Sequence, residues 1–273
     1  MKYKLIASDL DETLLNDDKH VGEKTREAIR KARAKGVLFV PNGGRGYTLI
    51  RQTLDEIDAL NKPGEYVVSF NGSVITENKN ERVIEKTLMD FDLINQLFQI
   101  GEDHSLPMHI YCMEEIYVCN LNESEKDYLD RMGFPYQVFD EPSIDFLRDQ
   151  PLVKMLFMNQ DRSQLEALRE EVPKDVLDVT TTTYSSNRYL EFNTGGVNKG
   201  KGLLQLAKLL DISPEEIIAV GDNSNDLSMI EAAGLGVAVE NAIPEIKKAA
   251  DHVLDCDNNH DSVAELIERF ILN

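Results

Sequence analysis

A short, largely apolar run at residues 3–8 is followed directly by the motif Asp-Leu-Asp-Glu-Thr, which begins at Asp9. The run contains neither Pro nor Gly and predicts a buried strand. Side chains alternate along an extended chain, so Asp9 and Asp11 point to the same side if the extension persists. Two carboxylates held close together cannot both ionise cheaply without a cation. Ligands bind at the carboxyl ends of strands in α/β sheets, so the motif indicates a metal-assisted site, with a solvated acidic turn as the alternative.

A second apolar run, at residues 217–220, also ends in acids. Asp222 follows it almost at once, and Asn225 and Asp226 come shortly after. In a chain this rich in Asp and Glu, a lone pair of acids is most often a solvated turn. Two buried-type strands that each end in clustered carboxylates instead favour a functional site.

Two segments between these runs carry groups suited to an anion. Gly43-Gly44-Arg45 follows the apolar run at residues 37–40, and Lys199 stands at a predicted helix start. Backbone amides at a helix start receive anions. Acids, amides and a lysine beside strand ends are the groups that hold a phosphoryl group and a divalent cation.

Taken in order, the four segments resemble the motifs of the haloacid dehalogenase-like phosphohydrolases. Within that family the chain is similar to the Cof-type sugar-phosphate phosphatases, which carry a large cap between the second and third motifs. The resemblance covers essentially the whole chain, and the first and fourth motifs are specific as a pair. It implies an α/β fold with a Rossmann-like parallel-sheet core at residues 1–82 and 194–273. An inserted α+β substrate-specificity cap is expected at residues 83–193.

The resemblance also implies catalytic roles. Asp9 matches the nucleophile, which attacks phosphorus to form an aspartyl phosphate. Asp11 matches the acid/base, which protonates the leaving alcohol and then deprotonates the attacking water. The implied metal site consists of Asp9, Asp222 and the backbone carbonyl of Asp11, with Asp226 as a direct or a supporting ligand, or simply as a helix cap. Hard oxygen ligands favour Mg²⁺ over Zn²⁺.

The phosphate contacts implied in the same way are those of Leu10, Thr13, Gly43, Gly44, Lys199 and Asn225. Lys201 is the local rival of Lys199. The family usually has Thr or Ser at the position of Gly43, so the hydroxyl that would bond the phosphate is absent and the backbone amides remain. A single lost hydrogen bond to a charged group costs about 1.5–3 kcal/mol, so activity is expected to weaken without vanishing.

Periodicity and turn residues predict the elements around these motifs. In the core we expect helices at residues 23–35, 47–60, 199–210, 227–233, 244–250 and 262–271, and strands at 65–70, 73–76, 236–239 and 252–254. Asn71-Gly72 predicts a hairpin turn. In the cap we expect helices at residues 91–102, 124–132 and 163–171, and strands at 108–111, 116–118, 136–139, 152–158, 176–179 and 189–192. The threonine run at residues 180–183 is expected in a strand or at its edge.

Composition limits the partners. The chain of 273 residues has a formal net charge of −20, which disfavours binding to nucleic acid and to anionic membrane surfaces. No apolar run approaches the length of a membrane span. Its cysteines, three in number, lack metal or redox spacing, and the N-terminus shows no signal peptide, so we expect reduced thiols in a cytoplasmic protein. A monomer or weak homo-oligomer is expected.

Together these features predict a cytoplasmic, Mg²⁺-dependent phosphatase of small phosphorylated metabolites, with sugar phosphates as the expected class. A catalytically weak or inactive sugar-phosphate-binding or regulatory protein is one alternative, because of Gly43. A phosphomutase is another, because an aspartyl phosphate can return its phosphoryl group to a second hydroxyl. A nucleotide hydrolase is disfavoured, since the stretch from Gly195 to Lys201 fits Gly-x-x-x-x-Gly-Lys but Gly202 stands where Ser or Thr would be needed.

Overall fold

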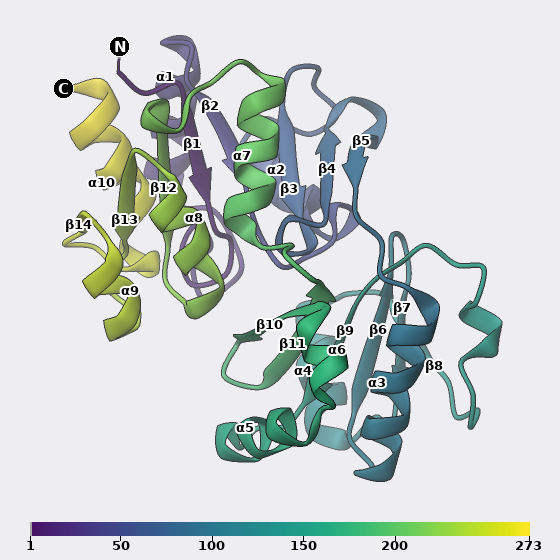
Figure 1. The fold of residues 1–273 in the computed structure, drawn as a ribbon. Coiled ribbons are helices and arrows are strands. Elements are labelled where there is room, and N and C mark those ends of the chain that lie inside the picture. Colours follow the sequence, from purple (N-terminus) through teal and green to yellow (C-terminus); the bar gives the residue numbers. More distant parts are fainter. Residues whose placement is uncertain (1) are drawn as a thin grey trace. The chain divides into compact units, whose positions relative to one another are not determined.

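A computed structural model describes residues 2–273, which form two compact units (Figure 1). The first unit takes the chain up to Lys86 and from Asn198 onward, and the second is the inserted stretch Thr87–Val197. Both divisions lie four residues beyond those expected from the sequence, at 82/83 and 193/194. Within residues 2–273, no helix combines the length and the apolar character needed to cross a membrane.

Five parallel strands form the central sheet of the first unit, in the order β14 (His252–Val253), β13 (Leu235–Ala238), β12 (Ile217–Gly221), β1 (Leu5–Ser8) and β2 (Leu38–Pro41). In this order β1 is paired on both sides, so Ser8 at its carboxyl end lies beside Val220 and Pro41. The parallel pairing confirms the predicted α/β class. It also brings the carboxyl ends of β1 and β12 together, although they are more than 200 residues apart in sequence.

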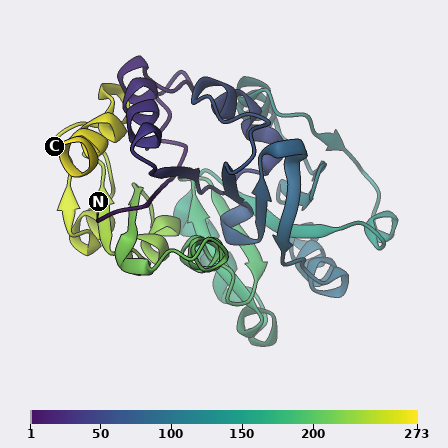
Figure 2. The same cartoon turned by 90° about the horizontal axis from the view of Figure 1, so that it is seen from above.

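Helices cover both faces of this sheet (Figure 2). They are α1 (Glu23–Ala34), α2 (Arg51–Glu56), α7 (Lys199–Leu209), α8 (Leu227–Ala232), α9 (Pro244–Ala249) and α10 (Ser262–Ile267). Ile6 of β1 packs in an apolar cluster with residues of α1 and α10, whereas Leu5 and Ala7 pack in a second cluster with residues of α7. This alternation along β1 follows from strand geometry and fixes which face each helix covers.

The helix expected at residues 47–60 is shorter than predicted. A 3₁₀ turn at Tyr47–Ile50 leads into α2, which ends at Glu56. Asp58 has a φ of 58°, in the left-handed region that ends helices. The terminal helix is also shorter, because α10 passes into a π turn at Glu268–Leu272.

A three-stranded antiparallel sheet completes the first unit, with β3 (Tyr66–Ser69), β4 (Val74–Glu77) and β5 (Arg82–Lys86). The hairpin turn between β3 and β4 is confirmed, since Asn71 and Gly72 both have positive φ, 57° and 98°. β5 was not predicted, because its side chains are exposed or half-exposed and show no apolar run. Its pairing with β4 explains why the first unit extends to Lys86.

The second unit contains a six-stranded sheet in the order β10 (Thr180–Ser185), β11 (Tyr189–Thr194), β9 (Leu152–Met158), β6 (Met108–Cys112), β7 (Ile116–Cys119) and β8 (Gln137–Val138). Its helices are α3 (Phe91–Asp103), α4 (Glu123–Met132), α5 (Arg162–Glu171) and α6 (Lys174–Asp178). Residues from one face of the sheet form an apolar cluster with side chains of α3 and α5. The threonine run lies in a strand, β10, as expected, and this strand is at the edge of the sheet.

The prediction of a strand at residues 176–179 is wrong, because this segment forms the last part of α6 and the residue that follows it. Two valines in four residues suggested a strand, since β-branched residues favour strands. In the structure Val176 is buried in the apolar cluster of the second unit, while Val179 follows the helix and is exposed. Tertiary packing therefore overrides the local preference here.

Candidate active site

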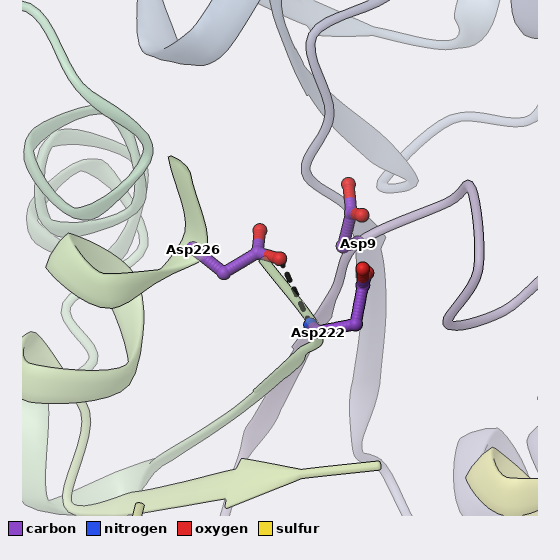
Figure 3. Close-up of side chains that lie close together, drawn as sticks. All are labelled: Asp9, Asp222 and Asp226. Atoms are coloured by element: carbon purple, nitrogen blue, oxygen red, sulfur yellow. Dashed lines mark hydrogen bonds between the residues drawn. The ribbon is translucent and has the colours of Figure 1, made fainter. Parts of the chain in front are cut away.

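Three aspartates gather at the carboxyl ends of β1 and β12 (Figure 3). Asp9 follows β1, Asp222 follows β12, and Asp226 closes the 3₁₀ turn Ser224–Asp226 before α8. Each offers a carboxylate oxygen, and these oxygens lie within 4.8 Å of one another. The backbone amide of Asp9 donates to the carbonyl of Val220 at 3.0 Å, which ties the two strand ends together.

Lys199, the first residue of α7, is fully buried between two of these acids. Its Nζ donates to Asp9 Oδ1 at 2.6 Å and to Asp226 Oδ1 at 2.5 Å. Lys201, the rival candidate, is exposed on the same turn. The structure therefore brings Lys199, and not Lys201, into the acidic cluster.

Asp226 is held by contacts on both carboxylate oxygens. Oδ1 accepts from Lys199, and Oδ2 accepts from the amides of Asp222 and Asn223 at 3.0 Å each. The contact with the Asp222 amide is the dashed line in Figure 3. A Cβ added at Gly221 would lie 2.4 Å from Asp226 Cγ, so glycine is needed there for this close approach. These contacts suit a residue that positions Lys199 and the Asp222 loop better than one that ligates a metal directly.

The side chain of Thr13 contacts an acid of the cluster. Its hydroxyl donates to Asp222 Oδ1 at 2.8 Å, and its carbonyl accepts from Ser262 at 3.2 Å. Thr13 therefore fixes the orientation of the Asp222 carboxylate.

Asp11 lies in a cationic clamp that the sequence analysis missed. Arg45 donates to both of its oxygens, from Nε at 2.8 Å and from a terminal nitrogen at 2.5 Å, and Lys19 Nζ donates at 2.9 Å. Arg45 was visible in the Gly-Gly-Arg turn but was given no role. Nothing in the sequence around Lys19 marks it as a partner of Asp11.

The glycine loop after β2 differs in part from expectation. The amide of Gly43 donates to the carbonyl of Val68 at 3.0 Å. It therefore serves the sheet and is not available to an anion, although the sequence predicted that it would be. Gly44 follows it in the loop, and Leu10 is buried with its carbonyl accepting from the amides of Leu14 and Leu15. Asn225 is half-buried in the turn before α8.

Asn42 is a further buried residue that the sequence analysis missed. Its side-chain nitrogen donates to the backbone carbonyl of Lys199 at 3.1 Å, and the residue is fully buried. It thus links the end of β2 to the start of α7. A lone Asn after a strand carries no signal that would have revealed this contact.

Without a cation, ionisation of Asp9 and Asp222 in the cluster is unfavourable. Burial, and then the nearby Asp226, raise the pKa of Asp9 to about 7 even though Lys199 opposes the shift. Burial, Asp226 and Asp9 raise the pKa of Asp222 well above its usual range. Although burial would lower the pKa of Lys199, the carboxylates of Asp226 and Asp9 raise it, so Lys199 stays charged. Burial would likewise raise the pKa of Asp11, but Arg45 and Lys19 together hold it below its ordinary value.

These residues fit a hard divalent cation. Three buried carboxylates face one ammonium group, which leaves an excess of negative charge in a site that water reaches poorly. The donors are oxygens, which suit Mg²⁺ and not a soft metal. A cation here would lower the raised pKa values of Asp9 and Asp222 and so keep Asp9 ionised.

We expect the metal-free protein to lose stability as the pH rises from about 4 to about 7. The folded protein binds the Asp9 proton up to about pH 7, whereas the unfolded chain releases it near pH 4, so folding becomes less favourable across this window. Asp222 acts in the same direction, and Asp11 acts in the opposite direction only at lower pH. The change should be on the order of a few kcal/mol. Urea titrations in EDTA at pH 5 and pH 7.5 measure it, and equal stabilities would contradict it.

Comparison with known proteins identifies the family. The family model described as haloacid dehalogenase-like hydrolase matches residues 6–267. The chain is 34% identical to YxeH of Bacillus subtilis, with 99% of each chain covered. It is 30% identical to the 5-amino-6-(5-phospho-D-ribitylamino)uracil phosphatase YcsE of the same organism, covering 98% of this chain and 96% of that protein.

The fold comparison agrees. A haloacid dehalogenase-like hydrolase from Bacteroides thetaiotaomicron superposes with a TM-score of 0.84 at 30% identity, covering 99% of this chain and 100% of that one. The chain belongs to the haloacid dehalogenase-like hydrolases, and the resemblance seen in its motifs is confirmed. It is therefore an enzyme of that hydrolase family.

Proposed function

We propose that the protein is a Mg²⁺-dependent phosphatase that hydrolyses small phosphorylated metabolites, with sugar and polyol phosphates as the class. The observation that carries this proposal is the buried contact between Lys199 and both Asp9 and Asp226, with Asp222 beside them. Such a group can neutralise a phosphoryl dianion next to an ionised carboxylate. The name of the relative YcsE, a phosphatase of a phosphoribityl compound, supports a phosphorylated polyol as substrate.

Each side chain has a role in this reaction. Asp9 attacks phosphorus, and the bond from phosphorus to the leaving oxygen breaks as Asp11 donates a proton to that oxygen. In the second step Asp11 takes a proton from water, which attacks the aspartyl phosphate and releases phosphate. Arg45 and Lys19 favour the ionised Asp11 that the second step requires, and they disfavour the protonated Asp11 that the first step requires. Lys199 balances charge throughout.

Asp9, Asp222 and the carbonyl of Asp11 would hold the cation, with Asp226 and Thr13 orienting the ligands and Lys199. When bound, Mg²⁺ supplies positive charge that stabilises the transferring phosphoryl group. We further propose that the first unit is the catalytic core and that the second unit is the cap that selects the substrate.

Release of phosphate from p-nitrophenyl phosphate tests the proposal. We expect turnover with Mg²⁺, none in EDTA, and recovery when Mg²⁺ is restored. Asp222→Asn should require a much higher Mg²⁺ concentration, because a ligand charge is lost. Turnover that is unchanged in EDTA would refute the metal dependence.

Gly43→Thr should raise kcat/KM by about tenfold or more, because it adds a hydroxyl donor beside Asp9. A Cβ at position 43 would lie 3.8 Å from Asp9 Oδ1 and 2.9 Å from Leu10 Cδ1, the end of a flexible side chain that can shift. The backbone of Gly43 does not adopt a left-handed φ, so threonine fits its conformation. Gly43→Ala is the matched control, since it adds the same Cβ without the hydroxyl. A threonine variant no faster than the alanine variant would show that the hydroxyl does not contribute to catalysis. An inactive wild type that becomes active with threonine at this position would favour the alternative of a sugar-phosphate-binding protein.

A further inference from the structure

The loop between β1 and α1 carries Lys19, which contacts Asp11 of the candidate active site. Lys19 Nζ donates to Asp11 Oδ1 at 2.9 Å, on the carboxylate that Arg45 also holds. The backbone of Lys19 has a φ of 66°, in the left-handed region that residues with a side chain seldom adopt. Such a conformation persists only where the surrounding structure holds it. The contacts that hold this part of the loop therefore decide where the Lys19 ammonium lies.

Asn16 closes a tight turn that contains Lys19. The amide of Lys19 donates to the Asn16 carbonyl at 2.9 Å. The amide of His20 donates to Asn16 Oδ1 at 2.9 Å, and the amide of Asn16 donates to the His20 carbonyl at 3.0 Å. Asn258, in the 3₁₀ turn before α10, donates to the carbonyl of Leu15 at 3.1 Å. These contacts fix the shape of the turn and anchor its first end.

Glu56, the last residue of α2, anchors the other end of the turn. Its Oε2 accepts from the amide of Val21 at 2.7 Å, and its Oε1 lies 2.5 Å from His20 Nδ1. Gln52, one helical turn earlier, donates to Oε1 at 3.1 Å. The Glu56 side chain is only 15% exposed. Although burial would raise the pKa of Glu56, the hydrogen bond from the Val21 amide and those from the neighbouring side chains hold it below its ordinary value. Glu56 therefore accepts these bonds as a carboxylate.

Both cations on Asp11 thus depend on the stretch of chain that follows β2. Arg45 belongs to this stretch and contacts Asp11 directly, whereas Glu56 belongs to it and acts through the loop that carries Lys19. The side chains of Lys19 and Asp11 are 36% and 33% exposed, and ion pairs with this exposure add little to stability. A small displacement of a catalytic group, by contrast, costs much in rate. The contacts of Glu56 therefore suit the placement of Asp11 better than the stabilisation of the fold.

We infer that Glu56 is a positioning residue for Asp11. By holding the backbone at Val21 it places Lys19 against the Asp11 carboxylate, and Lys19 and Arg45 together keep that carboxylate in one orientation. This inference rests on the proposed phosphatase function. It extends the machinery of the reaction to a residue outside the cluster of aspartates at the strand ends.

A double-mutant cycle tests the inference. Glu56→Ala should lower kcat for p-nitrophenyl phosphate by about tenfold and leave KM within about twofold, because Asp11 acts in the chemical steps and not in substrate binding. Lys19→Met alone should cause a similar loss. In the Lys19→Met background, Glu56→Ala should lower kcat by less than about twofold, because the contact that Glu56 places is already gone. A purely structural role of Glu56 would give the same loss in both backgrounds.

Three further variants separate positioning from folding. Glu56→Gln keeps an acceptor for the Val21 amide and should retain at least about half of the wild-type kcat. Asp55→Ala removes the neighbouring, exposed acid of α2 and should change neither kcat nor KM. If Glu56→Ala does not fold, Glu56→Asp takes its place in the cycle, because it keeps the charge but shortens the side chain. It should lower kcat only where Lys19 is present.

Failure of the inference can be told apart from failure of the proposed function. With an active wild type, equal losses of kcat in the two backgrounds, or a Glu56→Ala variant with wild-type kcat, would overturn the inference alone. A wild type that releases no phosphate from p-nitrophenyl phosphate with Mg²⁺ would refute the proposed function.

In that case acetylation of Lys19 by acetic anhydride decides the inference. Peptide mass spectrometry measures its rate relative to that of Lys24, which is exposed on α1. Glu56→Ala should raise the relative rate at Lys19 by at least about twofold, because an ammonium held against a carboxylate reacts slowly. An unchanged relative rate would show that Glu56 does not place Lys19 and would overturn the inference.

Discussion

Asp9→Asn should lower kcat for p-nitrophenyl phosphate by at least about 10³-fold, because the amide cannot act as the nucleophile. The substitution nearly preserves the size of the side chain. Lys199 keeps its contact with Asp226 at 2.5 Å, so the buried ammonium stays paired. We therefore expect the loss of activity to be chemical and not a consequence of unfolding.

The same substitution should not destabilise the metal-free protein at pH 7.5. Burial and Asp226 raise the pKa of Asp9 to about 7, so ionising it in the folded state is unfavourable. Removing that charge is expected to leave the melting temperature in EDTA unchanged or higher. Asp18→Asn, which makes the same change on an exposed loop, is the control and should keep full activity. An Asp9→Asn variant that retains a tenth or more of wild-type kcat would contradict the assignment of the nucleophile.

Lys199→Met should abolish most activity and destabilise the metal-free protein by about 3–5 kcal/mol, the usual cost of breaking a buried ion pair by removing one partner. Lys199 is fully buried between Asp9 and Asp226, so its loss leaves these carboxylates without a cation. The loss of stability should be smaller at pH 5, where protonation relieves the uncompensated charge on Asp9.

Urea titration at both pH values measures this effect. Lys201→Met is a matched control, because Lys201 lies on the same helical turn but is exposed, and it should change stability by less than about 0.5 kcal/mol. If the Lys199 and Lys201 variants were equally stable, the buried ion-pair network would not carry the charge balance that we assign to it.

The sequence could predict the main cluster because its residues follow strand ends. Asp9 and Asp222 come directly after apolar runs that pair in parallel, so the fold itself brings them together. Lys199 begins a helix whose N-terminus faces the same edge, where it contacts Asp9. Motif spacing and the α/β pattern are sufficient to predict the positions of these residues.

The contacts of the loops could not be predicted. Arg45 and Lys19 reach Asp11 from loops whose side-chain directions no periodicity specifies. The amide of Gly43 is taken by Val68 because β3 lies beside the end of β2, a long-range pairing that the local sequence does not encode. The same limitation applies to the segment at residues 176–179, where burial in a distant cluster decided between helix and strand.

Chemical trapping of the covalent intermediate tests the central claim most directly. Enzyme quenched with acid during turnover, then reduced with borohydride, should contain homoserine at position 9, because an acyl phosphate is reduced to an alcohol whereas a free carboxylate is not. Peptide mass spectrometry locates the change, and enzyme treated in the same way without substrate is the control. Homoserine at position 9 that depends on substrate is the predicted result. Sustained turnover with an unmodified Asp9, or with the change at another acid, would contradict the account.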